Sequence, residues 1–189
     1  TDIYVQHVRA NGTLDPAWPA SGCALCTSPG YQDQARAVPD GAGGWYIGGV
    51  FTTVGGQPRA NLAHVLADNS VSPWNPGANG VVRALSVSGT TVYAGGDFSS
   101  AGGQPRNRIV AVDASSGVAN AWDPNADGSV RVLAVDGALV YAGGSFTSIG
   151  GQVRNRIAAL DGGTALATGW NPNANSQVTA IAVSGGTVY

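Results

Sequence analysis

The sequence predicts an all-β protein of the propeller class, and two observations support this prediction. One pattern occurs three times in residues 42–189: Tyr46, Tyr93 and Tyr141, spaced 47 and then 48 residues apart, each precede a Gly-Gly pair and a Phe. Each copy consists of short apolar runs separated by Gly, Pro, Asn and Ser, and no copy shows a helical period. A period near 48 residues that is built from short strands is typical of a radial β-architecture in which each repeat forms one blade.

The middle repeat gives the clearest set of strands. We expect antiparallel strands at residues 81–88, 91–98, 107–113 and 118–123. The second and third strands are joined by a long polar loop, and Pro124 ends the fourth strand because proline has no amide hydrogen to donate. Each blade is therefore expected to contain four antiparallel strands and about 48 residues.

The same template divides the whole chain. We expect outer strands of a partial blade at 1–19, an insertion at 20–31, whole blades at 32–80, 81–128 and 129–176, and inner strands of a partial blade at 177–189. The two ends do not complement each other, because the loop with the second Gly pair is missing between them. We interpret the chain as a segment of a larger propeller, with a closed ring of four blades as the alternative.

The composition excludes two classes of partner. Only 11% of the residues are charged, the net charge is −2, and all nine cations are Arg. Without a basic cluster the chain offers no footprint for nucleic acid or for an anionic membrane surface. No apolar run approaches the roughly 18 residues that span a bilayer.

Cys23 and Cys26 lie in the expected insertion among Ser, Pro and Gly residues. A single C-x-x-C cannot supply the four ligands of a structural zinc, and a thioredoxin-like role would need a helix at the motif. We expect a local disulfide between them, which fits an oxidising compartment, with free thiols or redox and metal chemistry as alternatives. A surface rich in Asn, Ser, Thr and Gly also favours an extracellular or cell-surface location.

The full repeat reads Val-Tyr-Ala-Gly-Gly-Asp-Phe, then Gly-Gly, then Arg-Asn-Arg-Ile-Val-Ala-Val-Asp, and then Trp-Asp-Pro. The aromatic residue before Gly-Gly, the Asp that closes the third strand and the Trp after the hairpin resemble the kelch repeat. The whole pattern is similar to the bacterial delta-60-type propeller repeats of large secreted and surface proteins. This resemblance implies the propeller fold for nearly the whole chain, but it does not imply one activity, because propellers host binding, scaffolding and catalysis.

Several residue types recur once in every repeat and are expected to be structural. The indoles are expected to fill the wedge between blades, with an exposed platform for sugar rings as the alternative. The glycines are expected to allow close packing. The arginines are expected to bridge carboxylates or carbonyls, with a ligand-facing ring of cations as the alternative. These residues are Trp74, Trp122, Trp170, Gly95, Gly96, Gly143, Gly144, Arg106, Arg108, Arg154 and Arg156, with Asp113 and Asp161 as the expected partners of the arginines.

One loop resembles half of a calcium site. Asp123, Asn125 and Asp127 occupy alternate positions, which turns their oxygens toward a common centre, although the bidentate carboxylate of a complete loop is missing. Ordinary turn formation by Asp, Asn, Pro and Gly is the alternative, so no cofactor is expected other than this possible calcium ion. His7 and His64 are expected to be strand residues rather than ligands, and no motif of a known catalytic class is present.

We therefore expect a non-catalytic interaction or structural module of a larger extracellular or cell-surface protein. Protein or carbohydrate partners would bind the loops of several blades together, in particular residues 99–106 and 147–154, because these loops are polar and lie side by side. The rest of its own chain or other subunits would complete the ring. The alternative is the propeller domain of a secreted carbohydrate-active or oxidative enzyme whose catalytic residues lie outside this chain.

Overall fold

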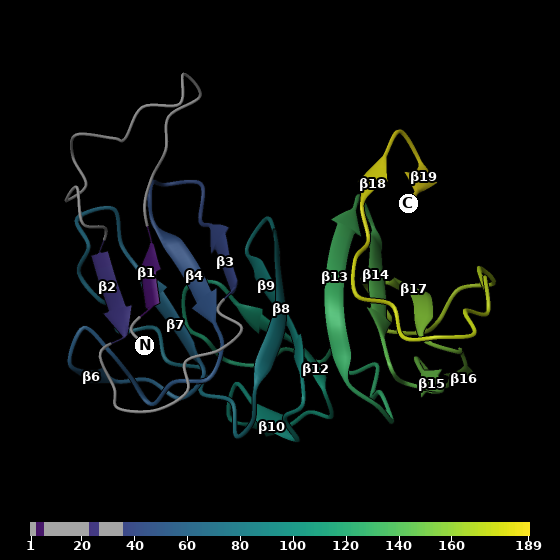
Figure 1. Cartoon of the computed structure of the whole chain (residues 1–189), viewed down its shortest axis with the longest axis horizontal. Coiled ribbons are helices and arrows are strands. Elements are labelled where there is room, and N and C mark those ends of the chain that lie inside the picture. Colours follow the sequence, from purple (N-terminus) through teal and green to yellow (C-terminus); the bar gives the residue numbers. More distant parts are fainter. Residues whose placement is uncertain (1–2, 6–22, 27–35) are drawn as a thin grey trace.

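The structure is a computed structural model that describes residues 3–5, 23–26 and 36–189. The described residues form strands, turns and loops without a helix, and the chain folds into a row of small antiparallel sheets (Figure 1). Within the described residues, no helical segment has the length and apolarity that a membrane crossing needs.

Three sheets of three strands form the body of the molecule. The first contains β3 (Arg36–Pro39), β4 (Trp45–Gly48) and β7 (Leu62–Val65); the second contains β8 (Val82–Ser88), β9 (Thr91–Gly96) and β12 (Ile109–Asp113); the third contains β13 (Val130–Asp136), β14 (Leu139–Gly144) and β17 (Ile157–Asp161). The second of the three strands lies in the middle of each sheet. Consecutive antiparallel strands are neighbours in this up-and-down order, with a short turn between the first and second strands and a longer loop that carries a hairpin between the second and third.

Five two-stranded pairs complete the structure. Each three-stranded sheet carries one short hairpin between its second and third strands, and two further pairs lie near the ends of the chain. These strands are β5 (Thr53–Val54) with β6 (Gln57–Pro58), β10 (Ser100–Ala101) with β11 (Gln104–Pro105), β15 (Ser148–Ile149) with β16 (Gln152–Val153), β1 (Ile3–Val5) with β2 (Cys23–Cys26), and β18 (Val183–Ser184) with β19 (Thr187–Val188).

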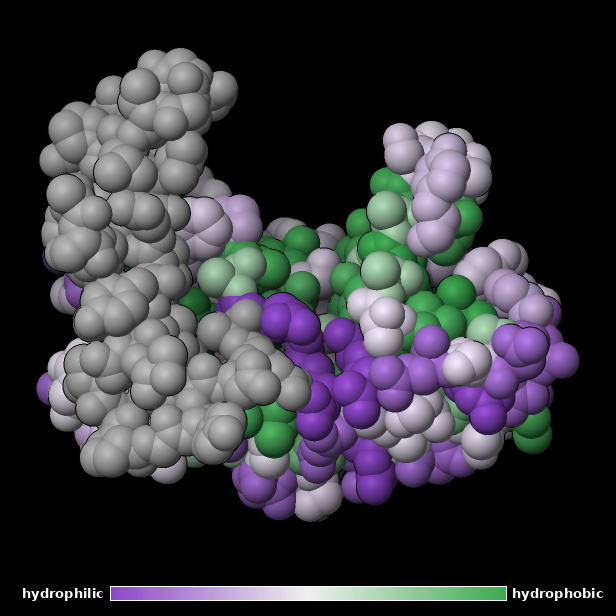
Figure 2. Space-filling model, viewed as in Figure 1, coloured by the Kyte–Doolittle hydropathy of each residue, from purple (hydrophilic) through white to green (hydrophobic). Residues whose placement is uncertain are grey.

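The first strands of successive sheets are neighbours in space. Strand β8 contacts β3 on one side and β13 on the other, and β13 also contacts β18. The sheets therefore stand side by side about a common axis, with their first strands innermost (Figure 1). Apolar residues gather in a hollow of the molecule beside the β18–β19 hairpin (Figure 2).

The second and third sheets repeat each other in detail. Residues Val82 and Val130 pair with Gly96 and Gly144, and in both sheets the register then shifts at one bulged residue, Arg83 or Arg131. A bulge inserts one unpaired residue and strengthens the local twist of the strand. Its recurrence at the same position shows that the repeat in the sequence is also a repeat of backbone geometry.

The predicted outer strand at 118–123 is the main difference from expectation, because only a single bridge between Val112 and Ala119 remains of it. Beyond this bridge the amide of Ala119 donates to the carbonyl of Gly102 at 3.0 Å, and the amide of Trp122 donates to the side chain of Asn120 at 2.9 Å. Ladder hydrogen bonds from the amides of Asp113 and Asn120 to the carbonyls of Val118 and Ala111 flank this bridge. The outer segment therefore pairs with the third strand at one place, and each sheet has three regular strands instead of four.

The glycine pairs at the ends of the middle strands allow close packing, as expected. A Cβ at Gly95 would lie 2.6 Å from Val130 in the next sheet, and a Cβ at Gly96 would lie 2.0 Å from the carbonyl oxygen of Val81. Gly143 and Gly144 meet equivalent obstacles in the third sheet. The first glycine of each pair brings two sheets together, and the second brings two strands of one sheet together.

Cys23 and Cys26 lie in strand β2, which pairs with β1, and not in the loop that the sequence predicts. The rest of the expected insertion, residues 20–22 and 27–31, lies outside the described residues, as does most of the segment 1–19. The disulfide between these cysteines stays a prediction.

Candidate functional site: a groove between neighbouring repeats

The recurring indoles lie between the sheets. Trp122 is 4% exposed, and its Nε1 donates to the carbonyl of Asp161 in the next repeat at 2.9 Å. Trp74 is 3% exposed and makes the same hydrogen bond to the carbonyl of Asp113 at 3.0 Å. Both indoles thus fill the wedge between repeats, and neither is available as an exposed platform for a sugar ring. Trp170, the third member of the series, is half-buried.

The recurring arginines hold backbone carbonyls. In Arg59, Arg106 and Arg154, Nη1 donates to the carbonyl of the preceding residue. Nη2 donates at 2.6 Å to the carbonyls of Ser72, Asn120 and Thr168, which follow the third strand of the same repeat. Each guanidinium therefore ties a hairpin to the outer segment of its own repeat. Arg106 also lies 3.6 Å from the carboxylate of Asp123.

The second arginine of each pair has an unusual backbone. Arg108 and Arg156 have φ angles of 63° and 64°, a region that side chains rarely adopt, and their Nη1 atoms donate to the carbonyls of Ala126 and Ala174. These carbonyls belong to the loops that lead into the following repeat, so these two arginines fasten one repeat to the next.

The expected partnership of the arginines with Asp113 and Asp161 is wrong. The carboxylate of Asp113 accepts hydrogen bonds from the hydroxyls and amides of Ser115 and Ser116, and these bonds hold its pKa well below the usual value of 3.8. The carboxylate of Asp161 accepts bonds from residues 163–164, which lower its pKa in the same way. Both aspartates close the turn that follows their own strand.

The three calcium candidates have separate partners. Asp127 accepts three hydrogen bonds from residues 147–148 of the next repeat, at 2.5 to 2.9 Å. The side-chain oxygen of Asn125 accepts a bond from Asn107 at 2.8 Å, and Asp123 lies on the surface. The described residues contain no group of three or more His, Cys, Asp or Glu that could hold a metal. The geometry therefore assigns Asp127 to a contact between repeats, and calcium stays a prediction of the sequence.

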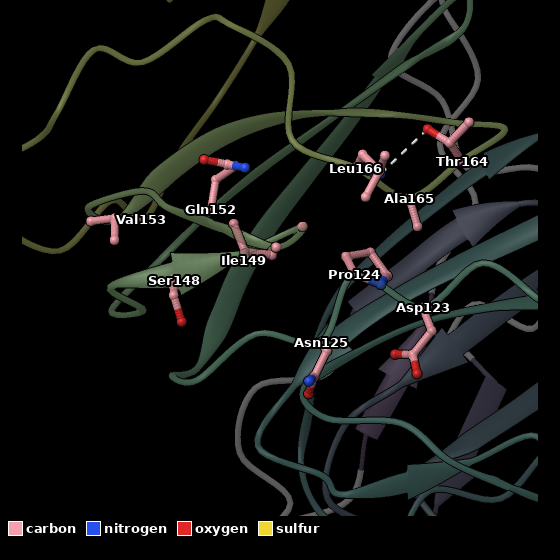
Figure 3. Close-up of a pocket in the computed structure, with 12 residues that line it drawn as sticks. Asp123, Pro124, Asn125, Ser148, Ile149, Gln152, Val153, Thr164, Ala165 and Leu166 are labelled. Atoms are coloured by element: carbon pink, nitrogen blue, oxygen red, sulfur yellow. Dashed lines mark hydrogen bonds between the residues drawn. The ribbon is translucent and has the colours of Figure 1, made fainter.

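A groove of about 530 Å³ opens where the second repeat meets the third (Figure 3). One wall consists of Asp123, Pro124 and Asn125, which follow the buried Trp122. The other wall comes from the third repeat, and its residues are Ser148, Ile149, Gly150, Gly151, Gln152, Val153, Thr164, Ala165 and Leu166. The amide of Gly150 donates to the carbonyl of Pro124 at 2.7 Å, so the floor of the groove joins the two repeats.

The walls of this groove combine polar groups with exposed aliphatic side chains. Val153 is 70% exposed and Leu166 is 60% exposed, although isolated exposed residues of this size are common on surfaces. Here they flank one hollow that also contains the carboxylate of Asp123 and the amides of Asn125 and Gln152 (Figure 3). A concave surface with apolar walls and a few polar groups is the usual form of a binding site.

Part of this groove recurs in the first repeat. A second groove of about 660 Å³ is lined by Gly55, Gln57, Arg59, Asn69, Ser70, Val71 and Pro73, all of the first repeat, which occupy the positions of residues 150–169 in the third. In the second repeat the amide of Gly102 donates to the carbonyl of Pro76 at 2.9 Å, as Gly150 does to Pro124. The hairpin and turn therefore line a groove in the first and third repeats, and the hydrogen bond between neighbouring repeats occurs in the second and third.

His64 is part of a buried cluster that the sequence did not predict. Its Nε2 lies 2.8 Å from Oδ2 of Asp40, and their side chains are only 11% and 7% exposed. Tyr46 stacks on the imidazole at 4.3 Å, and Trp74 packs against its edge. Burial opposes the charge on Asp40, but hydrogen bonds from His64 and from two backbone amides outweigh it and lower its pKa. His64 occupies the position that Ala111 occupies in the second repeat. In the first repeat this cluster serves as polar packing.

Comparison with known proteins supports the repeat but names no function. A family model described as a domain of unknown function (DUF5122) beta-propeller matches residues 136–161, which include β14 and β17. No curated protein matches the chain. Among solved structures, the computationally designed Ika8 protein aligns with a TM-score of 0.48 and 18% identity, over 89% of this chain and 58% of the designed one. The chain thus spans less than two thirds of that protein. The chain contains propeller-type repeats in an all-β fold.

Sequence reasoning found the region of the groove but not its lining. It singled out the loop 147–154 because the loop is polar and repeated, and this loop forms one wall. It missed Leu166, and it singled out Asp123 and Asn125 as calcium candidates rather than as a wall of a groove, because the two walls come from different repeats and no local pattern shows that they meet. An aliphatic residue after the hairpin turn of the second and third repeats, Val118 and Leu166, was the available signal.

Proposed function

We propose that this chain is a non-catalytic interaction module of an extracellular or cell-surface protein, and that its partners are segments of other proteins bound in the grooves between repeats. The observation that carries the proposal is the groove between the second and third repeats, whose hairpin and turn also line a groove in the first repeat. The hydrogen bond on its floor recurs between the first and second repeats. Repeated surfaces of this kind suit an extended partner that contacts several repeats at once.

Two features favour a protein segment over a carbohydrate. The lining of the groove in Figure 3 contains aliphatic side chains and amide groups but no aromatic ring, and the two recurring indoles beside it are buried. Exposed aromatic faces are the surfaces on which sugar rings stack, whereas Val153 and Leu166 suit the aliphatic side chains of a peptide.

The proposal also includes the finer architecture. We propose that the repeats are kelch-like blades of about 48 residues, similar to delta-60-type repeats, and that other parts of its own chain or other subunits complete the ring. The low content of charged residues and the two cysteines support an extracellular or cell-surface location.

A selection from a random-peptide library tests the binding function. Peptides enriched on the wild-type protein should bind the Leu166→Asp and Val153→Asp variants at least about tenfold more weakly. Each substitution places a carboxylate where an apolar side chain of the peptide would be buried, which is unfavourable. Tyr189→Asp is the matched control, since Tyr189 is 75% exposed and lies outside the groove. Failure to enrich any peptide, or equal binding to all three variants, would contradict the proposal.

A further inference from the structure

The bulged arginine of each inner strand is the starting point. Arg83 and Arg131 occupy the same position of the repeat, at the bulges of β8 and β13, and these two strands contact each other. The residue that follows the Gly-Gly pair corresponds to the partner of this arginine, and its identity differs between the repeats. It is Asp97 in the second repeat and Ser145 in the third.

In the second repeat, the bulged arginine binds a carboxylate. Nε and Nη2 of Arg83 both contact Oδ2 of Asp97, at 2.7 and 2.5 Å. A guanidinium that meets a carboxylate through two nitrogens forms one of the stronger pairs available to a protein. Burial opposes the charge on Asp97, but hydrogen bonds from Arg83 and Ser129, together with the charges of Arg83 and Arg131, lower its pKa.

The third repeat keeps the arginine and lacks the carboxylate. Nε of Arg131 is buried and has no hydrogen-bond partner among the described residues, although Nε of Arg83 is satisfied by Asp97. A buried donor without an acceptor costs free energy unless a ligand or water supplies the acceptor. Asp97 forms its ion pair with Arg83, and no ion pair of Arg131 is seen among the described residues.

We infer that Arg131 and Ser145 form a binding site for a carboxylate ligand, in which the ligand takes the place that Asp97 takes beside Arg83. Ser145 is exposed and has a shorter side chain than Asp97, its equivalent in the repeat before. Nε of Arg131 is covered in this structure, so a ligand would reach it only after neighbouring side chains move. The residues lie outside the groove described above, and the site therefore adds a second point of recognition to the proposed binding function. A small free carboxylate or an acidic side chain of a partner protein would satisfy the same chemistry.

Nitrogen-15 NMR of the arginine side chains tests this site directly. Titration with sodium succinate, against sodium chloride at equal ionic strength, should give a saturable shift of the Nε–Hε signal of Arg131, which an Arg131→Lys variant identifies by its loss. In Ser145→Asp the internal carboxylate should occupy the site, so the signal should already be shifted and succinate should have no effect. Ser145→Asn, of the same shape without the charge, should retain the response.

A parallel titration with a blocked peptide that contains a single Asp distinguishes the two sources of the carboxylate. Tighter binding of the peptide points to an acidic segment of a protein, and tighter binding of succinate points to a small carboxylate. A shift that does not saturate with either probe, or an equal response in Ser145→Asp, would overturn the site. Loss of peptide binding in the Leu166→Asp and Val153→Asp variants would leave the response of Arg131 to a carboxylate unchanged. The proposed groove and the proposed carboxylate site can therefore fail separately.

Discussion

Replacement of Trp122 by Ala should test how the repeats are held together. The indole is 4% exposed, packs edge-on against Tyr93 at 5.1 Å and donates to the carbonyl of Asp161 in the next repeat. Burial of about 200 Å² of aromatic surface at about 25 cal/mol per Å² gives an upper value near 5 kcal/mol. The carbonyl of Asp161 still accepts a bond from the amide of Ala165, so its polar group is not left unsatisfied. We therefore expect a destabilisation of about 3–5 kcal/mol.

Reversible unfolding in guanidinium chloride, followed by near-ultraviolet circular dichroism, measures this change. Trp122→Phe should cost less, because it loses the hydrogen bond, worth about 1 kcal/mol, and only part of the ring. Trp170→Ala is the matched control, since Trp170 has the same repeat position but is half-buried. A cost for Trp122→Ala no larger than that of Trp170→Ala would show that the indole does not join the repeats.

Three further predictions concern single positions. Ala165 has a φ of 65°, so Ala165→Gly should raise the free energy of unfolding by about 0.5–1 kcal/mol, and a lower value would mean that the strain is relieved elsewhere. The lowered pKa of Asp40 contributes stability above the unfolded value near 4 that is lost as the pH falls through the folded pKa, so stability should drop as the pH falls below about 5, and Asp40→Asn should flatten this part of the profile. Cys23 and Cys26 lie three residues apart in one strand, which separates their Cα atoms by about 10 Å, beyond the roughly 7 Å limit of a disulfide. The expected disulfide therefore requires the backbone of β2 to rearrange at these residues. Mass measurement before and after reduction with alkylation tests it, and labelling of both thiols without reductant would reject the disulfide.

The repetition in the sequence determined most of the fold. Three copies of a 47- to 48-residue pattern, with short runs of β-branched residues, placed the first three strands of the middle repeat close to their observed bounds. The Gly pairs and the buried indoles were also predictable, because a residue that recurs in every repeat at a fixed phase meets the same neighbours each time. Each repeat packs only against its neighbours, so the contacts between repeats can be predicted from the repeat period.

Other features depended on contacts between repeats or on competition among hydrogen bonds. The predicted fourth strand is reduced to one bridge, after which the amide of Trp122 donates to the side chain of Asn120 instead of to the third strand. The aspartates at the strand ends bind their own turns instead of the arginines. The groove and the unpaired Nε of Arg131 were also decided by tertiary structure, since each needs residues from separate strands or repeats to meet. The sequence by itself thus determined the repeating unit. The tertiary structure decided which polar groups the neighbouring units satisfy and which remain for a partner, because a one-dimensional pattern does not show the partner of a hydrogen bond.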